Sequence, residues 1–166
     1  MTEIQTFKIS PGPGAVVAEV EGIRVSFLTC FEIYFPEYVE RVASLSPDVV
    51  IFPSYQRSEE SEVIRKQVMG RALDLEAFIL RASYSMGENS LTGGCSMIVN
   101  PRGRIILNAR QRTGLFTRTI NPKEKRPHPQ AHGLGIMNSR QITEDFRKPE
   151  LYRPAGPSVA RKDFEK

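Results

Sequence analysis

Residues 22–54, "GIRVSFLTCFEIYFPEYVERVASLSPDVVIFPS", decide the fold of this chain. β-Branched and apolar residues fill the stretch that ends at Cys30, which is typical of a strand. Pro36 suits the first turn of a helix, where its missing N–H is not needed. Helical spacing follows it at Tyr38, Val39, Val42 and Leu45. A short apolar run closed by Pro53 has the pattern of a strand buried on both faces, so the stretch indicates a layered α/β fold.

The alternation of strands and helices continues on both sides of this stretch. Upstream, residues 15–22, "AVVAEVEG", predict a strand that turns at Glu21–Gly22 into the strand leading to Cys30. Downstream, residues 58–77 predict a long helix that begins with a capping-box pattern. Its apolar face is expected at Val63, Gln67, Ala72 and Leu75.

Two further segments of the chain have strand character. Residues 78–83, "FILRAS", predict one strand. Residues 95–107, "CSMIVNPRGRIIL", predict a hairpin that turns at residues 100–103. The resulting order of elements is that of a single α/β domain over residues 1–120.

The composition changes after residue 120. Residues 121–166 contain many prolines, both histidines and little periodicity, and we expect an extended, partly disordered tail there. His128 and His132 are four residues apart, but the neighbouring prolines oppose a helix and no third ligand has suitable spacing. The sequence therefore predicts no metal site.

The overall composition restricts the class of protein. The chain has 166 residues, of which 40% are hydrophobic and 25% charged, as in soluble globular proteins. No apolar stretch approaches the ~20 residues of a membrane span, and the N-terminus does not have the pattern of a signal peptide. We therefore expect a cytoplasmic protein without a membrane partner.

Charge and cysteine content exclude two further classes. The net charge is +4, but its basic residues form no aromatic-basic motif, so we expect no nucleic-acid partner. The two cysteines, Cys30 and Cys95, are too few for a disulfide framework and lack zinc-site spacing. Any role for them is as single thiols.

The order of these motifs resembles the nitrilase superfamily, the carbon-nitrogen hydrolases. Farther along the chain, Arg71–Ala72, Gly94–Cys95–Ser96 and "IVNPRGRII" resemble later motifs of the family, and "RKPELYRP" resembles its C-terminal ending. The resemblance covers residues 10–155 and implies the C-terminal half of an α-β-β-α sandwich. In residues 22–54 the matching positions are Cys30, Phe31, Glu32, Phe35, Pro36, Glu37, Arg41, Pro53 and Ser54.

The resemblance also implies an activity and a site. Family members hydrolyse non-peptide C–N bonds of amides or nitriles through a thioester or thioimidate, and Cys30 matches their nucleophile. We expect Phe31 to offer a backbone N–H to an oxyanion and Tyr55 to line the substrate pocket, so both are substrate-binding candidates. No cofactor is implied. Family dimers predict a homo-oligomer with residues 36–45 and 59–75 at the interface.

The catalytic triad of the family is Glu, Lys and Cys, and this chain matches only the Cys. Lys8, Glu3, Glu19 and Glu21 lie in segments that do not correspond to the family's Lys and Glu. A thiol with an ordinary pKa of ~8.5 needs a neighbouring base or positive charge to act as a thiolate. We therefore expect a chain that is inactive alone and whose partner is a separate N-terminal half. The alternatives are a truncated gene product and a non-catalytic interaction or scaffold protein.

Three nearby residues have structural interpretations that compete with functional ones. Glu32 and Glu37 could form an acid/base pair, but we expect a structural role, with Glu37 pairing with Arg41 across one helical turn. Cys95 is expected to be a small packed residue rather than a reactive thiol.

Overall fold

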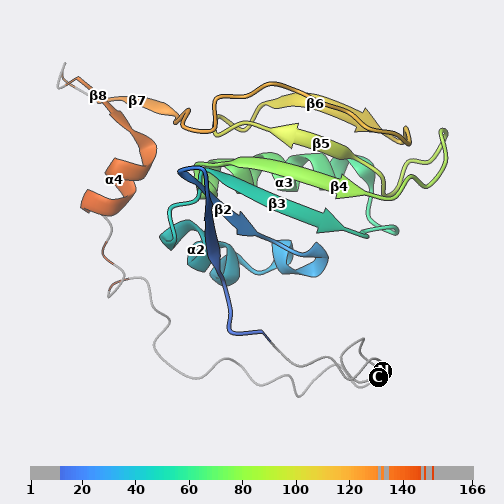
Figure 1. Ribbon diagram of the computed structural model, residues 1–166, viewed down its shortest axis with the longest axis horizontal. Helices are drawn as coiled ribbons and strands as arrows, with labels where there is room; N and C mark the ends of the chain where they lie inside the picture. The colour runs from blue at the N-terminus through green and yellow to red at the C-terminus, as the bar shows by residue number, and fades with distance from the viewer. Residues whose placement is uncertain (1–11, 131, 133–134, 147, 149–150, 152–166) are drawn as a thin grey trace. The chain divides into compact units, whose positions relative to one another are not determined.

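The structure is a computed structural model that describes residues 12–130, 132, 135–146, 148 and 151. Six strands form one mixed sheet in the order β1-β2-β3-β4-β5-β6, and two α-helices pack against one of its faces (Figure 1). The strands are β1 Val17–Val20, β2 Ile23–Phe27, β3 Val49–Ser54, β4 Phe78–Ser83, β5 Ser96–Val99 and β6 Ile105–Arg110. The helices are η1 Cys30–Tyr34, a 3₁₀ turn, followed by α2 Pro36–Ser44 and α3 Ser61–Leu75.

The middle of the sheet is parallel and its margins are antiparallel. Strands β2, β3 and β4 run parallel, joined by α2 and α3, whereas β1 and the β5–β6 hairpin pair in the antiparallel direction. The predicted turn at Glu21–Gly22 is present, with φ of 51° and 74°. Because β2 to β4 are parallel, the segments that follow them meet at one edge of the sheet. Cys30 and Tyr55 both lie at this edge.

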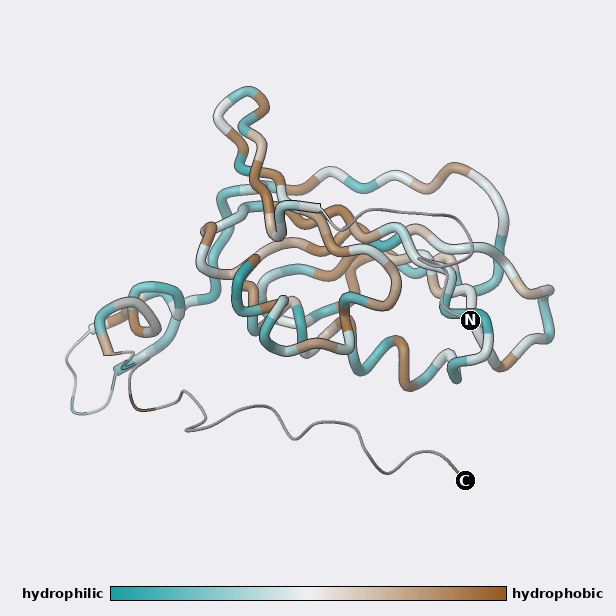
Figure 2. The backbone as a smooth tube through the Cα atoms, turned by 90° about the horizontal axis from the view of Figure 1, so that it is seen from below, coloured by the Kyte–Doolittle hydropathy of each residue, from teal (hydrophilic) through white to brown (hydrophobic). Residues whose placement is uncertain are grey.

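The hydrophobic core lies between the sheet and the two helices. Buried residues of η1 and α2 meet those of α3 and of the inner face of the sheet. Figure 2 shows hydrophobic segments gathered where strands and helices pack together. The largest fully buried side chains include Leu28, Ile33, Phe52, Ile64, Ile79 and Met97.

The prediction that β3 is buried on both faces is wrong. Its burial alternates: Val50 and Phe52 face the helices, while Ile51 is 40% exposed on the opposite face. The reason is that the helices cover only the inner face of this sheet. A row of aligned apolar residues crosses the other face, the outer face, and consists of Phe27, Ile51, Leu80, Ile98 and Leu107.

The predicted apolar face of α3 is displaced by one residue in its first half. The buried residues are Ile64, Val68, Ala72 and Leu75, whereas Val63 is 40% exposed. The helix begins at Ser61 rather than Ser58, and no side chain caps its N-terminal residue, so the predicted capping box is absent there. Gln67 is only half-buried and accepts a hydrogen bond from the Gln56 side chain.

The predicted β5–β6 hairpin is confirmed. The side-chain oxygen of Asn100 accepts the backbone N–H groups of Arg102 and Arg104 at 3.1 and 3.0 Å. Gly103 has φ of 69°, a conformation that glycine adopts without steric cost. The turn is therefore specified by the local sequence.

Residues 121–126 are tied to the amino-terminal side of β3. Asp48, whose side chain is 6% exposed, accepts hydrogen bonds from the ammonium groups of Lys123 at 2.6 Å and Lys125 at 3.1 Å. It also accepts the backbone N–H of Arg24. Burial alone would raise the pKa of Asp48, but these three donors outweigh it and lower the pKa to about 2.

The chain divides into two compact units between Pro127 and His128. At this boundary begins β7 Pro127–Pro129, which pairs with β8 Ile136–Asn138, and α4 Ser139–Phe146 follows. The expectation of an extended tail over residues 121–166 did not include this helix. Asn138 begins it, because its side chain accepts the backbone N–H of Gln141 at 2.8 Å. Within the part of the chain described, no helix combines the length and apolar composition that a membrane crossing requires.

Candidate active site

Cys30 begins the 3₁₀ turn η1, three residues after β2 ends. Its φ is 43°, in the left-handed region that non-glycine residues rarely adopt. Its side chain is half-buried, and the sulfur accepts the backbone N–H of Tyr55 at 3.3 Å. Tyr55 directly follows β3, so two parallel strands bring these residues together. The strand was predicted to end at Cys30; it ends at Phe27, and Cys30 begins the turn that leads to α2.

The turn that carries Cys30 is held from both ends. The carboxylate of Glu32 accepts the backbone N–H of Thr29 at 2.6 Å, and buried Ile33 anchors the turn in the core. From α3, the guanidinium of Arg71 donates to the carbonyl oxygen of Ile33 at 3.2 Å. Glu32 therefore has the structural role expected of it.

The predicted ion pair between Glu37 and Arg41 is wrong. Both side chains are exposed on α2, and the ion pairs found among the described residues do not include this one. An exposed pair one helical turn apart gains little energy, and the entropy of two long side chains opposes it.

Exposed aromatic side chains belong to the two segments that meet at Cys30. Phe31 is 66% exposed, and its ring centroid is 5.3 Å from that of Tyr34. Tyr55 is half-exposed, meets Tyr84 edge-on at 5.0 Å, and has the guanidinium of Arg57 5.3 Å from its ring centroid. Of the two predicted substrate-binding residues, Tyr55 contacts Cys30 through its backbone, whereas the Phe31 ring extends outward.

A polar network lies beneath these aromatics. The Tyr34 hydroxyl donates to Glu59 at 2.8 Å and accepts the side-chain amide of Gln56 at 3.1 Å. Burial, and then the neighbouring carboxylate of Glu59, raise the pKa of Tyr34, against the hydrogen bond from Gln56 that lowers it. Tyr34 is therefore a neutral hydrogen-bond donor at physiological pH.

Arg81 is a functional candidate that sequence reasoning missed. Its side chain lies on the inner face of β4 and the residue is only 3% exposed. It donates to the carbonyl oxygens of Gly94 and Cys95, to the Ser54 hydroxyl and to the Gln56 side-chain oxygen. Burial lowers its pKa to about 10, so it is still charged at neutral pH. The signal in the sequence was an arginine inside an otherwise apolar run, "FILRAS".

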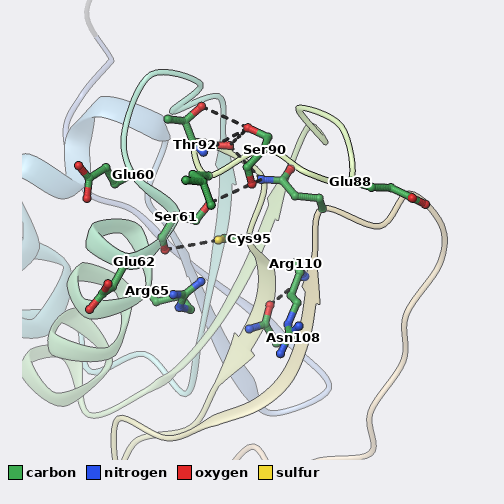
Figure 3. Close-up of a pocket in the computed structure, with 12 residues that line it drawn as sticks. Glu60, Ser61, Glu62, Arg65, Glu88, Ser90, Thr92, Cys95, Asn108 and Arg110 are labelled. Carbon is green, nitrogen blue, oxygen red and sulfur yellow. Dashed lines mark hydrogen bonds between the residues drawn. The ribbon is translucent and has the colours of Figure 1, made fainter.

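Cys95 is packed, as expected. It is 1% exposed, and its thiol donates to the carbonyl oxygen of Ser61 at 3.5 Å. It lies at a cleft of about 820 Å³ between the start of α3, residues 88–92 and the ends of β5 and β6 (Figure 3). Figure 3 places Arg65 on α3 across this cleft from Arg110 on β6. Cys30, Phe31 and Tyr55 do not line the cleft.

No metal centre is found among the described residues, since His, Cys, Asp and Glu side chains form no group of three that could hold an ion. His128, one of the two histidines considered above, is exposed on β7. The arrangement at Cys30 is therefore a thiol beside backbone and aromatic groups, with a buried cation nearby.

Comparison with known proteins identifies a family. The sequence model of the carbon-nitrogen hydrolases matches residues 2–130. An (R)-stereoselective amidase of Pseudomonas sp. is 31% identical over 102 residues, which are 60% of this chain and 37% of that protein. The 2-oxoglutaramate amidase of Bacillus subtilis is 22% identical over 136 residues, which are 81% of this chain and 49% of the amidase.

Solved structures agree on the fold. A variant of the amidase from Nesterenkonia sp. AN1, with the acetamide moiety of fluoroacetamide added covalently at its active-site cysteine, superimposes with a TM-score of 0.58 at 23% identity. The match covers 69% of this chain and 44% of that one. This chain thus spans less than half the length of each of the three amidases compared.

Proposed function

Since this chain belongs to the carbon-nitrogen hydrolase family, we propose that it carries the nucleophile half of an amidase-like active site, with Cys30 as the nucleophile. In this reaction the Cys30 sulfur attacks the amide carbonyl carbon, the C–N bond breaks, and the amine leaves with a proton. Water then hydrolyses the thioester to release the acid and regenerate the thiol. The proposed substrates are small amides or nitriles.

The observation that carries this proposal is the geometry of Cys30. Its sulfur is half-exposed at the edge where parallel strands end, and it meets the Tyr55 backbone N–H at 3.3 Å. A hydrogen bond to sulfur favours the thiolate over the thiol. We propose that the exposed aromatics Phe31 and Tyr55 contact the substrate beside it.

We propose that an N-terminal half outside these residues completes the site by supplying the family's Glu and Lys. The outer face of the sheet supports this proposal. Phe27 and Ile51, each 40% exposed, are aligned there with half-buried Leu80, Ile98 and Leu107. A second sheet packed on this face would bury that row, as the two sheets of a sandwich do.

We also propose that the protein works in the cytoplasm, and this proposal has a chemical basis. Both cysteines are free thiols, which a reducing compartment preserves. A nucleophilic thiol that must remain reduced is compatible with such a compartment.

The test is a comparison of the chain alone with a completed site. The substrate is butyramide, the amide found in complex with a variant of the Nesterenkonia amidase, and the readout is ammonia release. We expect the chain alone to release no ammonia above buffer. A fusion of the N-terminal part of the Pseudomonas amidase to this chain should release ammonia, and Cys30→Ala should abolish the release.

A matched variant and two outcomes make the test decisive. Cys95→Ala removes the other thiol and should leave turnover of the fusion intact, because Cys95 is only 1% exposed. Turnover by the chain alone that disappears in Cys30→Ala would mean that these residues already contain a complete site. A folded fusion without turnover would favour the non-catalytic interaction protein instead.

A further inference from the structure

Arg81 is a buried cation whose contacts are all neutral groups. Burying a charge costs several kcal/mol unless opposite charge or hydrogen bonds compensate it. Two backbone carbonyls, a hydroxyl and an amide oxygen accept its hydrogen bonds, and its Nε has no partner. Among the described residues, no carboxylate forms an ion pair with it. The remaining groups that could offset its positive charge are weak acids, namely two thiols and a phenol.

The contacts of Arg81 connect it with the nucleophile. One terminal nitrogen reaches Ser54 and Gln56 at 3.3 Å each, the two residues on either side of Tyr55. Tyr55 in turn donates its N–H to the Cys30 sulfur. Ser54 also donates to Gln56 at 3.0 Å, so the short segment after β3 is held as a unit. The guanidinium thus fixes the segment that contacts Cys30.

The acidic groups that interact with Arg81 are the thiols and a phenol. Burial lowers the pKa of Arg81, and negative charge on Cys95, then Cys30, then Tyr34 would act against this effect. In general, a positive charge close to a thiol favours its ionised form. Cys95 is 1% exposed and its thiol is bonded to the carbonyl oxygen of Ser61, whereas Cys30 is half-buried at the sheet edge.

We propose that Arg81 is a positioning residue that holds the Tyr55 N–H against Cys30 and stabilises the Cys30 thiolate with its positive charge. The inference rests on the proposed function only in making Cys30 the nucleophile. A nucleophilic thiol needs a nearby group that favours its thiolate form, and Arg81 would supply part of that effect from within this chain. The role is carried out through Ser54, Tyr55 and Gln56 rather than by contact with substrate.

The other titratable groups around Cys30 are already bonded elsewhere. Glu32 accepts the Thr29 N–H, and Glu59 accepts the Tyr34 hydroxyl. Both carboxylates would disfavour a thiolate, so they act against the effect assigned to Arg81.

Two other arginines lie on elements packed against the Cys30 turn. Arg57 is exposed over the Tyr55 ring, and Arg71 forms an ion pair with Asp74 at 3.0 Å. Solvent screens the first charge and the carboxylate offsets the second. Arg81 is therefore the cation whose field on Cys30 is least screened.

The test measures the rate of Cys30 alkylation by iodoacetamide between pH 5.5 and 9.5, read for each cysteine by mass spectrometry on the full chain. Arg81→Met should slow Cys30 alkylation at pH 7 roughly 3- to 10-fold, because less of the thiol is ionised, and should shift the rate profile to higher pH. At pH 9.5 the rates of the two proteins should converge. Arg81→Lys keeps a basic group but offers fewer donors, and burial lowers the pKa of a lysine, so its Cys30 profile should fall between those of the parent chain and Arg81→Met.

A second variant keeps the charge on Arg81 but neutralises its field. Gln56→Glu places a carboxylate against the guanidinium and should slow Cys30 alkylation at pH 7 in the same direction as Arg81→Met. The matched control is Arg24→Met, because Arg24 also bonds backbone carbonyls from a strand but lies at the opposite end of β2. It should leave the Cys30 profile unchanged.

Cys95 reports whether a variant has unfolded, since a buried thiol reacts quickly only when the fold opens. Should Arg81→Met unfold the chain, Gln56→Glu decides the question. The proposal would be overturned if the Cys30 alkylation rate of Gln56→Glu followed the same pH profile as that of the parent chain. It would also be overturned if Arg24→Met slowed Cys30 alkylation as much as Gln56→Glu does. Alkylation needs no turnover, so failure of the amidase proposal would leave this result intact.

Discussion

The backbone of Cys30 has a conformation that costs free energy in isolation. A φ of 43° in a residue with a Cβ costs on the order of 1–3 kcal/mol, and it persists only where the surrounding structure enforces it. Here Glu32 holds the residue before Cys30, and the Tyr55 N–H meets its sulfur. Contacts on both sides of the turn thus hold Cys30, the proposed nucleophile, in place.

Replacing Glu32 tests how much the turn depends on its carboxylate. Glu32→Ala removes the acceptor of the Thr29 N–H and should lower the free energy of unfolding by about 1 kcal/mol, as loss of a helix cap does. Urea denaturation at pH 7 measures the change. Glu37→Ala is the matched control and should alter stability by less than about 0.5 kcal/mol. Glu37 is exposed and takes part in none of the ion pairs formed by the described residues. Equal losses in both variants would mean that Glu32 is not a structural acid.

Sequence alone predicted part of the candidate site. The candidates Cys30 and Tyr55 follow from local patterns and from the family resemblance, and their roles stay predictions. Arg81 could not be recognised as part of the site, because its partners Ser54 and Gly94 lie 27 and 13 residues away in sequence. The segments that meet at a sheet edge are known only once strand order is known.

At the scale of elements, the predictions succeeded where short local signals decide the structure. The β5–β6 turn is specified by Asn100 and Gly103, and Pro36 begins α2 as expected. The face of α3 was placed one residue early because Val63 and Ile64 are both apolar and spacing alone does not choose between them. Packing against the sheet buries Ile64 and leaves Val63 exposed.

The attachment of residues 121–126 to the sheet should weaken in acid. The pKa of Asp48 is about 2 in the folded chain and 3.8 without these contacts, so the folded state binds its proton less tightly. The stabilisation is therefore complete only above about pH 5 and is lost as the pH falls from there to about 2. At neutral pH it amounts to roughly 2 kcal/mol, at 1.36 kcal/mol per pKa unit.

The difference in unfolding free energy between the parent chain and Asp48→Asn measures this effect. It should be largest at pH 6 and shrink toward pH 2. Asp74→Asn serves as the control, because its carboxylate is about half-exposed and its pair with Arg71 is on the surface. A difference for Asp48→Asn that does not change between pH 6 and pH 2 would contradict the ion cluster as the cause.

The first unit of the molecule has two surfaces of different character. The outer face of the sheet has an aligned apolar row from Phe27 to Leu107, whereas the exposed sides of the helices are mainly polar and include the ion pair of Glu62 with Lys66. Figure 1 shows both helices on the same side of the sheet. Family resemblance predicts self-association through the helices, and the apolar row is the surface proposed for the N-terminal half.

Two charge-introducing variants separate these surfaces. Ile51→Lys places an ammonium in the middle of the apolar row and should weaken binding of an N-terminal half by tenfold or more, because the charge would be buried on association. Val63→Lys changes a residue of the same exposure, 40%, on α3 and should reduce self-association while leaving that binding intact. Light scattering of the chain alone measures self-association, and titration with the N-terminal part of the Pseudomonas amidase measures binding of the N-terminal half. If Ile51→Lys binds that half as tightly as the parent chain does, the outer face is not the docking surface that we propose for it.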